Sequence, residues 1–246
     1  MAFYSEFNKY YDEIFPTGKS QLRFISSRVP KNSKILDVAC GTGNYSIALS
    51  EMGHEVFAVD LDEGMICQLN KKAENKKVKL HALVEDMKSI GEKLRPHSFN
   101  CIYCIGNSLV HLTEINDIYT VIKDIYNLLN QDGVMIIQTV NYDRILESNI
   151  NHLPTIHNPE AGVKLVRRYQ YDKDKHIINF NTQLVIETEF QPISYNNSVP
   201  LYPLRSFEIK ELLNKIGFKE VKLYGDFEEN EFNQKAFSMI IEARKG

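Results

Sequence analysis

Apolar residues recur along the chain with two different periods, and the period changes near residue 140. Before that point, short apolar runs alternate with segments whose apolar residues are three or four positions apart. The runs predict buried strands, and the wider spacing predicts helices that cover them, as in a parallel sheet with helices on both faces. The expected strands are residues 34–40, 54–60, 78–84, 98–105 and 133–140, and the expected helices are residues 45–52 and 62–74 and a third between a cap at Thr113 and a turn at Asp132-Gly133.

After residue 140 the apolar positions alternate with polar ones, which is typical of a strand with one buried face. The segment 176–188 has this pattern and would pair with residues 163–171 across a tight turn. Ser206 then caps a further amphipathic helix that ends at Gly217, and two apolar runs complete the chain as a hairpin.

These elements predict an α/β fold, a doubly wound, mostly parallel seven-stranded sheet of the Rossmann-like type. Residues 1–140 and 205–246 would form this domain, and residues 141–204 would be inserted in it as an antiparallel β cap. Aromatic residues at helical spacing predict two short helices in residues 1–28, which we expect to form an N-terminal lid.

Length and composition favour a globular protein that binds a small molecule. The chain has 246 residues, of which 43% are hydrophobic, and its net charge is −3. Nearly balanced charge disfavours nucleic acid and anionic membranes as partners. The first residues lack the regions of a signal peptide, and no apolar run approaches about eighteen residues, so we expect a soluble, cytoplasmic protein. The pattern predicts no particular oligomeric state.

Cys101 and Cys104 form a C-x-x-C pair, which has to be weighed as a metal or redox site. The pair lies inside an apolar run that predicts a buried strand, where residues three apart point to opposite faces. Two such thiols cannot share one ion, so we expect buried cysteines and no metal site.

The segment KILDVACGTGNYS, a strand followed by a glycine-rich turn and a helix, carries the strongest chemical signal. At Gly41 and Gly43 the missing Cβ lets the backbone approach a ligand, and the helix beyond offers free N–H groups. A dinucleotide site would need a third glycine, where the chain has Ser46. Asp37, before the glycines, suits a ligand that is positively charged nearby.

Further acids follow the next two strands. Asp60 ends the second strand, where its carboxylate can accept hydrogen bonds from two ribose hydroxyls. Asp86 and Met87 follow the third strand and offer an acceptor for an exocyclic amine beside an apolar face for a purine. Together with Asp37 they predict a pocket for an adenosine joined to a cationic, amino-acid-like tail, which is S-adenosylmethionine. The alternative interpretation is that these acids are only loop residues.

The motifs DVACGTG, VFAVDLD and VEDM, in this order, resemble those of the class I S-adenosylmethionine-dependent methyltransferases over nearly the whole chain. The segments CIGNSLVHL and NYDRIL further resemble motifs of glycine and glycine/sarcosine N-methyltransferases. The resemblance implies transfer of a methyl group to a small-molecule amine, with S-adenosylmethionine as the donor, S-adenosylhomocysteine as its product and no metal.

The same resemblance implies which residues hold the cofactor. Ala39 and Gly41 would line its methionine end, Ile105 would contact the adenosine, and His111 would touch the cofactor. From the sequence alone, His111 can equally be a hydrogen-bonded structural histidine. Lys19, in the lid, would reach the cofactor carboxylate or be an ordinary surface lysine.

The acceptor side is expected to consist of neutral groups that orient an amine without pairing with it as an ion. The resemblance implies Asn107 and Tyr142 for this role. Tyr202, in a loop between two prolines, and Tyr11 are further candidates. An aromatic residue at helical spacing, such as Tyr11, is also typical of a packed core.

Val140 departs from the resemblance, because the glycine enzymes have an arginine before NYD that holds the substrate carboxylate. Without that arginine, the substrate carboxylate would lose charge-assisted hydrogen bonds of about 1.5 to 3 kcal/mol each. Arg167, Arg168 and Arg205 are candidates to supply a replacement charge, although surface arginines are usually only solvated.

Other functions stay open. An amino sugar, a phenol or a carboxylate oxygen as the acceptor would keep the fold and cofactor and change only the cap. A nicotinamide oxidoreductase is disfavoured by Asp37 and the missing third glycine. A protein that binds S-adenosylmethionine without catalysis would have the same pocket.

Overall fold

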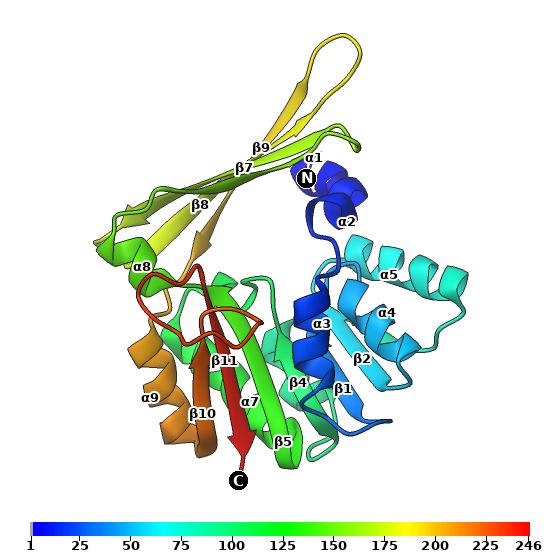
Figure 1. The fold of residues 1–246 in the computed structure, drawn as a ribbon, viewed down its shortest axis with the longest axis vertical. Coiled ribbons are helices and arrows are strands. Elements are labelled where there is room, and N and C mark those ends of the chain that lie inside the picture. Colours follow the sequence, from blue (N-terminus) through cyan, green and yellow to red (C-terminus); the bar gives the residue numbers. More distant parts are fainter. Residues whose placement is uncertain (1) are drawn as a thin grey trace.

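The computed structural model describes residues 2–246, which form a large α/β body with a smaller sheet beyond one end of it (Figure 1). The body contains a seven-stranded sheet of order β10-β11-β5-β4-β1-β2-β3, and the smaller sheet has the order β6-β7-β8-β9. The predicted fold class, a mostly parallel seven-stranded sheet with an antiparallel insertion, is confirmed.

Strands β1 to β5 of the large sheet are parallel, and β11 runs antiparallel between β5 and β10. The parallel strands bring their carboxyl ends to the edge that faces the smaller sheet (Figure 1). The strands are β1 Lys34–Val38, β2 Glu55–Asp60, β3 His81–Val84, β4 Phe99–Cys104, β5 Leu129–Val140, β10 Phe218–Tyr224 and β11 Ser238–Lys245.

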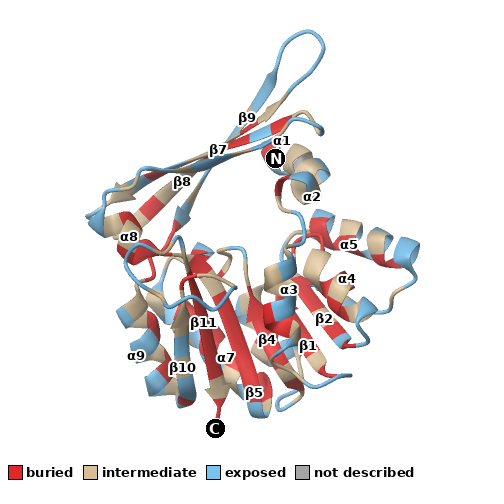
Figure 2. Ribbon diagram, viewed as in Figure 1, coloured by how far each residue is buried: buried red, intermediate tan, exposed pale blue. Residues whose placement is uncertain are grey.

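Helices cover both faces of the large sheet. Phe24 and Leu49, from α3 and α4, pack with Tyr103 on one face, and Ile122, from α7, packs with Ile102 on the other. The most completely buried strands are the central ones, including β4, β5 and β11 (Figure 2). The helices of the body are α3 Lys19–Ser26, α4 Asn44–Glu51, α5 Glu63–Lys76, α6 Ile90–Lys93, α7 Ile115–Leu128, α8 Tyr142–Glu147 and α9 Ser206–Ile216, with 3-10 turns η2 Met87–Ser89 and η3 Leu109–His111.

The smaller sheet, which we call the cap, is an antiparallel meander. Its strands are β6 His152–Asn158, β7 Val163–Asp172, β8 Ile177–Ile186 and β9 Ile193–Leu201. The predicted pairing of β7 with β8 is confirmed. Tyr169, Ile178 and Leu201 of the cap belong to the same apolar cluster as the core of the body. The cap is therefore packed on the body through an apolar contact.

The start of the chain lies between the cap and the glycine-rich turn. It consists of α1 Ala2–Phe7, η1 Asn8–Tyr10 and α2 Tyr11–Ile14. Phe3 and Ile14 pack with apolar residues of the cap. Asp12 accepts hydrogen bonds from Thr42 Oγ1 at 2.5 Å and from Lys72 Nζ at 2.7 Å. These contacts attach the same short segment to the cap and to the body.

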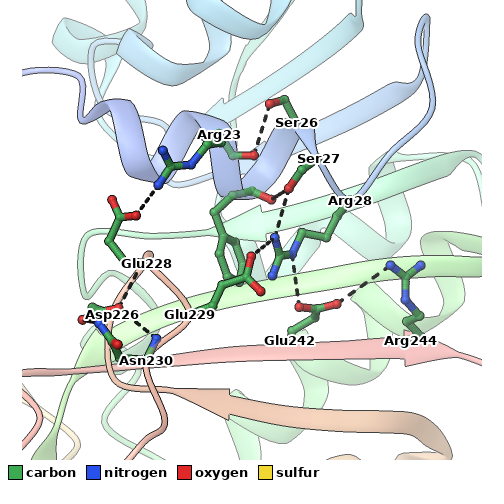
Figure 3. Close-up of polar contacts among 11 residues, drawn as sticks. Arg23, Ser26, Ser27, Arg28, Asp226, Glu228, Glu229, Asn230, Glu242 and Arg244 are labelled. Atoms are coloured by element: carbon green, nitrogen blue, oxygen red, sulfur yellow. Dashed lines mark hydrogen bonds and ion pairs between the residues drawn. The ribbon is translucent and has the colours of Figure 1, made fainter.

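A buried ion pair joins the segment directly after α3 to the large sheet (Figure 3). Arg28 Nε donates a hydrogen bond to Glu242 Oε2 of β11 at 3.1 Å, and the two side chains are only 9% and 7% exposed. The guanidinium also lies 3.4 Å from the centre of the Phe24 ring. Within α3 itself, Arg23 pairs with Glu228 in solvent. Arg28, two residues beyond α3, therefore makes the buried ionic contact with the sheet, and Phe24 and Ile25 bury the helix itself.

The boundaries of two helices correct the predictions made from the pattern. Thr113 does not cap α7, because the helix begins at Ile115 with Glu114 as its N-cap residue and without a capping side chain. The helix also ends before the predicted turn, since β5 begins directly after it. Ser206 is the first residue of α9, and Arg205 is its N-cap.

Cys101 and Cys104 are fully buried in β4 and belong to apolar clusters on opposite faces of the sheet. The prediction that the two thiols point apart is confirmed. Within residues 2–246, no set of three or more His, Cys, Asp or Glu side chains is arranged to hold a metal ion. The helices of the same residues are all too short or too polar to cross a membrane.

Candidate cofactor and acceptor site

The turn between β1 and α4 is made of residues with positive φ. Ala39, Gly41 and Gly43 have φ angles of 59°, 56° and 75°. Positive φ is uncommon for a residue with a Cβ, such as Ala39, and backbone strain of this kind collects at functional sites. The N–H of Cys40 donates to the carbonyl of Val59 at 3.0 Å, which ties the turn to the end of β2.

Asp60, the last residue of β2, holds the turn through its carboxylate. Its Oδ2 accepts a hydrogen bond from the N–H of Gly41 at 2.7 Å, and its Oδ1 accepts one from the N–H of Asp62 at 2.9 Å. Burial raises the pKa of this carboxyl, although the backbone hydrogen bonds work in the opposite direction. Each oxygen has a second lone pair, so the carboxylate can still accept two hydrogen bonds from a ligand.

Asp37 is the more deeply buried acid of the site, and it is only 3% exposed. Its Oδ2 accepts hydrogen bonds from Ser46 Oγ at 2.5 Å and from the Tyr103 hydroxyl at 2.7 Å. Burial raises the pKa of this carboxyl to about 7, because the two hydroxyls offset only part of the lost hydration. The partners of Asp37 are hydroxyls and not cations, so its negative charge is not neutralised by the protein.

A first cavity of about 680 Å³ opens at the carboxyl ends of β2 and β3. It brings together five residues that the sequence predicted to bind the cofactor, namely Ala39, Asp60, Asp86, Met87 and His111. Burial lowers the pKa of His111, so that the imidazole is neutral at physiological pH. Acids and an apolar side chain therefore share this cavity, as the sequence predicted.

A second cavity of about 360 Å³ lies on the other side of the turn. Tyr11, Asp37, Ile105 and Asn107 line it, and Ala39 lines both this cavity and the first. Asn107, three residues beyond the end of β4, also has positive φ, at 68°. The two cavities thus meet at the strained turn.

A third cavity of about 260 Å³ lies under the cap. Tyr11, Asn107, Val140 and Arg167 line this cavity as well as the second. The hydroxyl of Tyr11 covers Gly41, where a Cβ would lie only 3.0 Å from it. Each of the three cavities therefore shares lining residues with the other two, from the end of β2 to the cap.

Comparison with known proteins identifies the body. Residues 35–133 match the family described as a methyltransferase domain. A glycine/sarcosine N-methyltransferase from Aphanothece halophytica is 28% identical over 196 residues, which cover 80% of this chain and 70% of that protein. Glycine N-methyltransferase from Homo sapiens is 32% identical over 130 residues, which cover 47% of this chain and 43% of that protein. The chain belongs to the class I S-adenosylmethionine-dependent methyltransferases.

Solved structures of methyltransferases share the fold over the whole chain. An S-adenosylmethionine-dependent methyltransferase from Clostridium acetobutylicum has a TM-score of 0.82 at 17% identity and covers 99% of both chains. An amino pentose methyltransferase from Micromonospora echinaspora, solved with S-adenosylmethionine bound, has a TM-score of 0.69 at 14% identity, over 100% of this chain and 97% of that one. The family assignment sets aside the nicotinamide oxidoreductase and the non-catalytic binding protein as alternatives.

In this methyltransferase Asn107 and Tyr142 are hydrogen-bonded to each other. Asn107 Nδ2 donates a hydrogen bond to the Tyr142 hydroxyl at 3.0 Å, and Asn107 Oδ1 accepts one from the N–H of Val140 at 2.9 Å. Tyr142 is fully buried behind Asn107, and burial raises the pKa of its hydroxyl well above the ordinary value. Asn107 borders the cavities, and Tyr142 supports it from behind.

Tyr202 and Lys19 are not among the residues that line the three cavities. The Tyr202 hydroxyl donates to Glu208 at 2.7 Å, at the junction of the cap with α9. Lys19 is exposed at the first turn of α3. The contacts of these two residues with ligands stay predictions.

Sequence reasoning missed two residues that shape the methyltransferase site. Asp12 connects α2 to the glycine-rich turn, and Gln138 Oε1 accepts the N–H of Gly106 at 2.7 Å beside the second cavity. Asp12 lies between Tyr11 and Glu13 in an aromatic stretch, where neither acid belongs to a recognisable motif. Gln138 interrupts the apolar run of β5, and that interruption was the available signal.

Proposed function

We propose that this methyltransferase binds S-adenosylmethionine at the carboxyl ends of β1 and β2 and methylates an amine nitrogen of a small molecule under the cap. The observation that carries the proposal is the meeting of unlike cavities at the glycine-rich turn. The first combines acids with an apolar side chain, which suits a nucleoside. The third is bordered by Tyr11 and Asn107, which are neutral hydrogen-bonding groups that suit an amine, and the second, which Asp37 also lines, shares both residues with it.

The charges in the site fit a cationic cofactor. Asp37 is a buried acid without a cationic partner, and a positively charged ligand would stabilise its ionised form. Asp60 has lone pairs free for ribose hydroxyls after its two backbone contacts. Asp86 and Met87 border the part of the first cavity that would take the purine.

When bound, S-adenosylmethionine supplies a methyl group that its sulfonium already activates, so no side chain has to act as a strong base. The chain has to hold a neutral amine in line with that methyl group and exclude water. As the N–C bond forms, the S–C bond breaks, and the amine releases one proton to water. Asn107, fixed by Val140 and Tyr142, would orient the amine, and Tyr11 would close the site above Gly41.

The proposal is tested by binding and by turnover. Calorimetric titration with S-adenosylmethionine and S-adenosylhomocysteine is expected to show binding of both. Labelled cofactor is expected to transfer its methyl group to at least one amine in a panel of glycine, sarcosine, an amino sugar, a phenol and a carboxylic acid. Label found only on oxygen acceptors would overturn N-methylation, and failure to bind either nucleoside would overturn the cofactor site.

Replacing Asp60 by asparagine is expected to weaken binding of S-adenosylmethionine by about 1 to 3 kcal/mol, roughly fivefold to 150-fold. The amide has one acceptor oxygen instead of two, so it cannot serve both backbone N–H groups and the ribose hydroxyls. Asp117→Asn is the matched control, because Asp117 borders the same cavity from α7 but pairs with Lys88 in solvent. Equal dissociation constants for the Asp60 variant and the control, measured by calorimetry, would contradict the assignment.

Affinity for S-adenosylmethionine is expected to rise with pH between about 5.5 and 7. Burial raises the pKa of Asp37 to about 7, so below that pH its carboxyl is largely protonated in the free protein. A cationic ligand prefers the ionised form and must displace the proton, which costs up to tenfold in affinity per pH unit. Asp37→Asn should bind weakly and lose this slope. Calorimetry in buffers of different ionisation enthalpy measures the released proton, and a wild-type affinity that is flat over this range would be the contrary result.

A further inference from the structure

Arg167 interrupts an apolar row on the inward face of the cap. Val163, Leu165 and Tyr169 alternate along β7 and are buried, and Arg167 occupies the position between the last two. Arg168, the next residue, has the opposite orientation and is exposed. A cation on an apolar face loses hydration, so a partner is needed to offset that cost.

The Arg167 guanidinium has little compensation from the protein. Its Nη2 donates a hydrogen bond to the carbonyl of Pro154 at 2.6 Å, and its Nε is buried without a hydrogen-bond partner among the described residues. Burial lowers the pKa of Arg167, and the group that opposes this shift is the Tyr169 hydroxyl and not a carboxylate. The side chain thus directs an unneutralised charge and a free donor at the cavities it lines.

A second buried donor lies beside it. Thr182 of β8 is directly opposite Arg167 in the strand pairing, and it lines the third cavity too. Its hydroxyl oxygen is buried and has no hydrogen-bond partner within residues 2–246. Two adjacent buried donors without acceptors are costly in a folded protein, and an anion in the cavity would satisfy both.

We propose that Arg167 and Thr182 form an anion-binding subsite in the cap wall of the acceptor cavity, and that the amine acceptor carries a carboxylate held there. This inference rests on the proposed function, because it assumes that the acceptor occupies the third cavity and reaches the cofactor through the second, which Asp37 also lines. The subsite fixes the acceptor from the cap side, and the amine is then directed towards Asn107 and the glycine-rich turn.

The other arginines of this region are not available for the role. Arg205 is already paired with Asp143 at 2.6 Å and with Glu147 at 2.5 Å. Arg168 faces away from the acceptor cavity, with the polar residues of the outer face. Val140, where the glycine enzymes have their arginine, lines the same two cavities as Arg167. The positive charge of the acceptor site has therefore moved from the body to the cap.

A carboxylate fits this subsite better than a phosphate. The third cavity has a volume of only about 260 Å³, and its walls include Phe3, Leu165 and Phe180. A planar guanidinium matches the planar carboxylate, whereas a phosphate would bring a further oxygen and charge for which the cavity offers no second arginine among the described residues.

The test compares Arg167→Met with Arg168→Met, which removes the same charge from the other face of β7. The probes are the ω-amino acids from glycine to 4-aminobutanoate, sarcosine, the amide of each, and aminomethylphosphonate. Their binding is measured by calorimetry and by the shift of the unfolding temperature, with and without S-adenosylhomocysteine. At least one carboxylate should bind to the wild type and to Arg168→Met, and its amide about tenfold to a hundredfold less tightly.

Arg167→Met should bind that carboxylate about tenfold to a hundredfold less tightly and no longer distinguish it from its amide, while its affinity for S-adenosylhomocysteine stays unchanged. Thr182→Val should show a smaller loss of the same kind. Failure of every carboxylate to bind the wild type, equal binding by Arg167→Met, or binding of the phosphonate alone would overturn the proposal. This test measures binding of the acceptor. A failure to transfer the methyl group would therefore contradict the proposed function and leave the subsite unaffected.

Stability distinguishes a ligand-binding arginine from a structural one. Without ligand, Arg167→Met is expected to unfold at the same or a higher temperature than the wild type, because it removes an uncompensated cation from an apolar face. Arg205→Met should unfold at a lower temperature, because it leaves two carboxylates without their partner. A lower unfolding temperature for Arg167→Met, together with an unchanged preference for carboxylates, would assign Arg167 a structural role and overturn the subsite.

Discussion

Replacing Gly43 by alanine is expected to lower the free energy of unfolding by about 2 to 5 kcal/mol. Gly43 has a φ of 75°, a region in which an L-residue is strained. The added Cβ would also lie 2.4 Å from both Cγ and Cδ1 of Leu69, which is fully buried against the sheet. The methyl group has no room unless the buried Leu69 side chain or the helix that carries it moves. Urea unfolding followed by circular dichroism measures the loss.

Gly53→Ala is the matched control for this prediction. Gly53 also has positive φ, at 91°, but the nearest atom to an added Cβ is Asn32 Oδ1 at 3.6 Å. This variant should lose only the backbone contribution, about 1 to 2 kcal/mol. Adding Leu69→Ala to the Gly43 variant should remove the clash but also apolar packing. If the variants at Gly43 and Gly53 were equally stable, the contact with Leu69 would have no energetic weight.

Replacing Arg28 by methionine is expected to destabilise the protein by about 3 to 5 kcal/mol, because it leaves the buried Glu242 without its main partner. Arg244 lies 3.8 Å from Glu242 and is itself partly exposed, so it replaces Arg28 poorly. The double variant Arg28→Met/Glu242→Leu should recover most of the loss, since an apolar pair needs no compensation. Chemical unfolding of both single variants and the double variant measures this coupling.

Arg23→Met serves as the control for the ion pair of α3. Arg23 and Glu228 are largely exposed, and exposed pairs contribute about 0 to 1 kcal/mol (Figure 3). A similar loss for Arg23→Met and Arg28→Met would indicate that the whole helix, and not the buried pair, determines the stability of this contact.

The body and the grouping of the proposed cofactor residues in one cavity could be predicted from the sequence because their signals are local. Strand ends, glycines and acids lie within a few residues of one another in each motif, and the order of strands follows from the alternation of elements. Asp60 and Asp86 both line the first cavity, as the motif spacing predicted. This prediction needs no knowledge of contacts between residues that are far apart in the sequence.

The acceptor side depends on contacts that no local pattern contains. The loop around Tyr202 predicts that this residue borders the site, yet its hydroxyl donates a hydrogen bond to Glu208. Arg205 is paired with Asp143, which lies in a different helix. The choice between Arg167 and Arg168 needed the register of β7, because a shift by one residue exchanges the two faces of a strand.

The thiols of Cys101 and Cys104 lie on opposite faces of β4, so a thiol reagent can probe each face of the sheet separately. Burial raises the pKa of both, so neither Cys101 nor Cys104 reacts while its layer is closed. Cys101 packs with Phe24 of α3, and Cys104 belongs to the cluster of Ile122 in α7. Thiol labelling of Cys101 therefore reports opening of the α3 side, labelling of Cys104 reports opening of the α7 side, and labelling of both at one rate reports global unfolding.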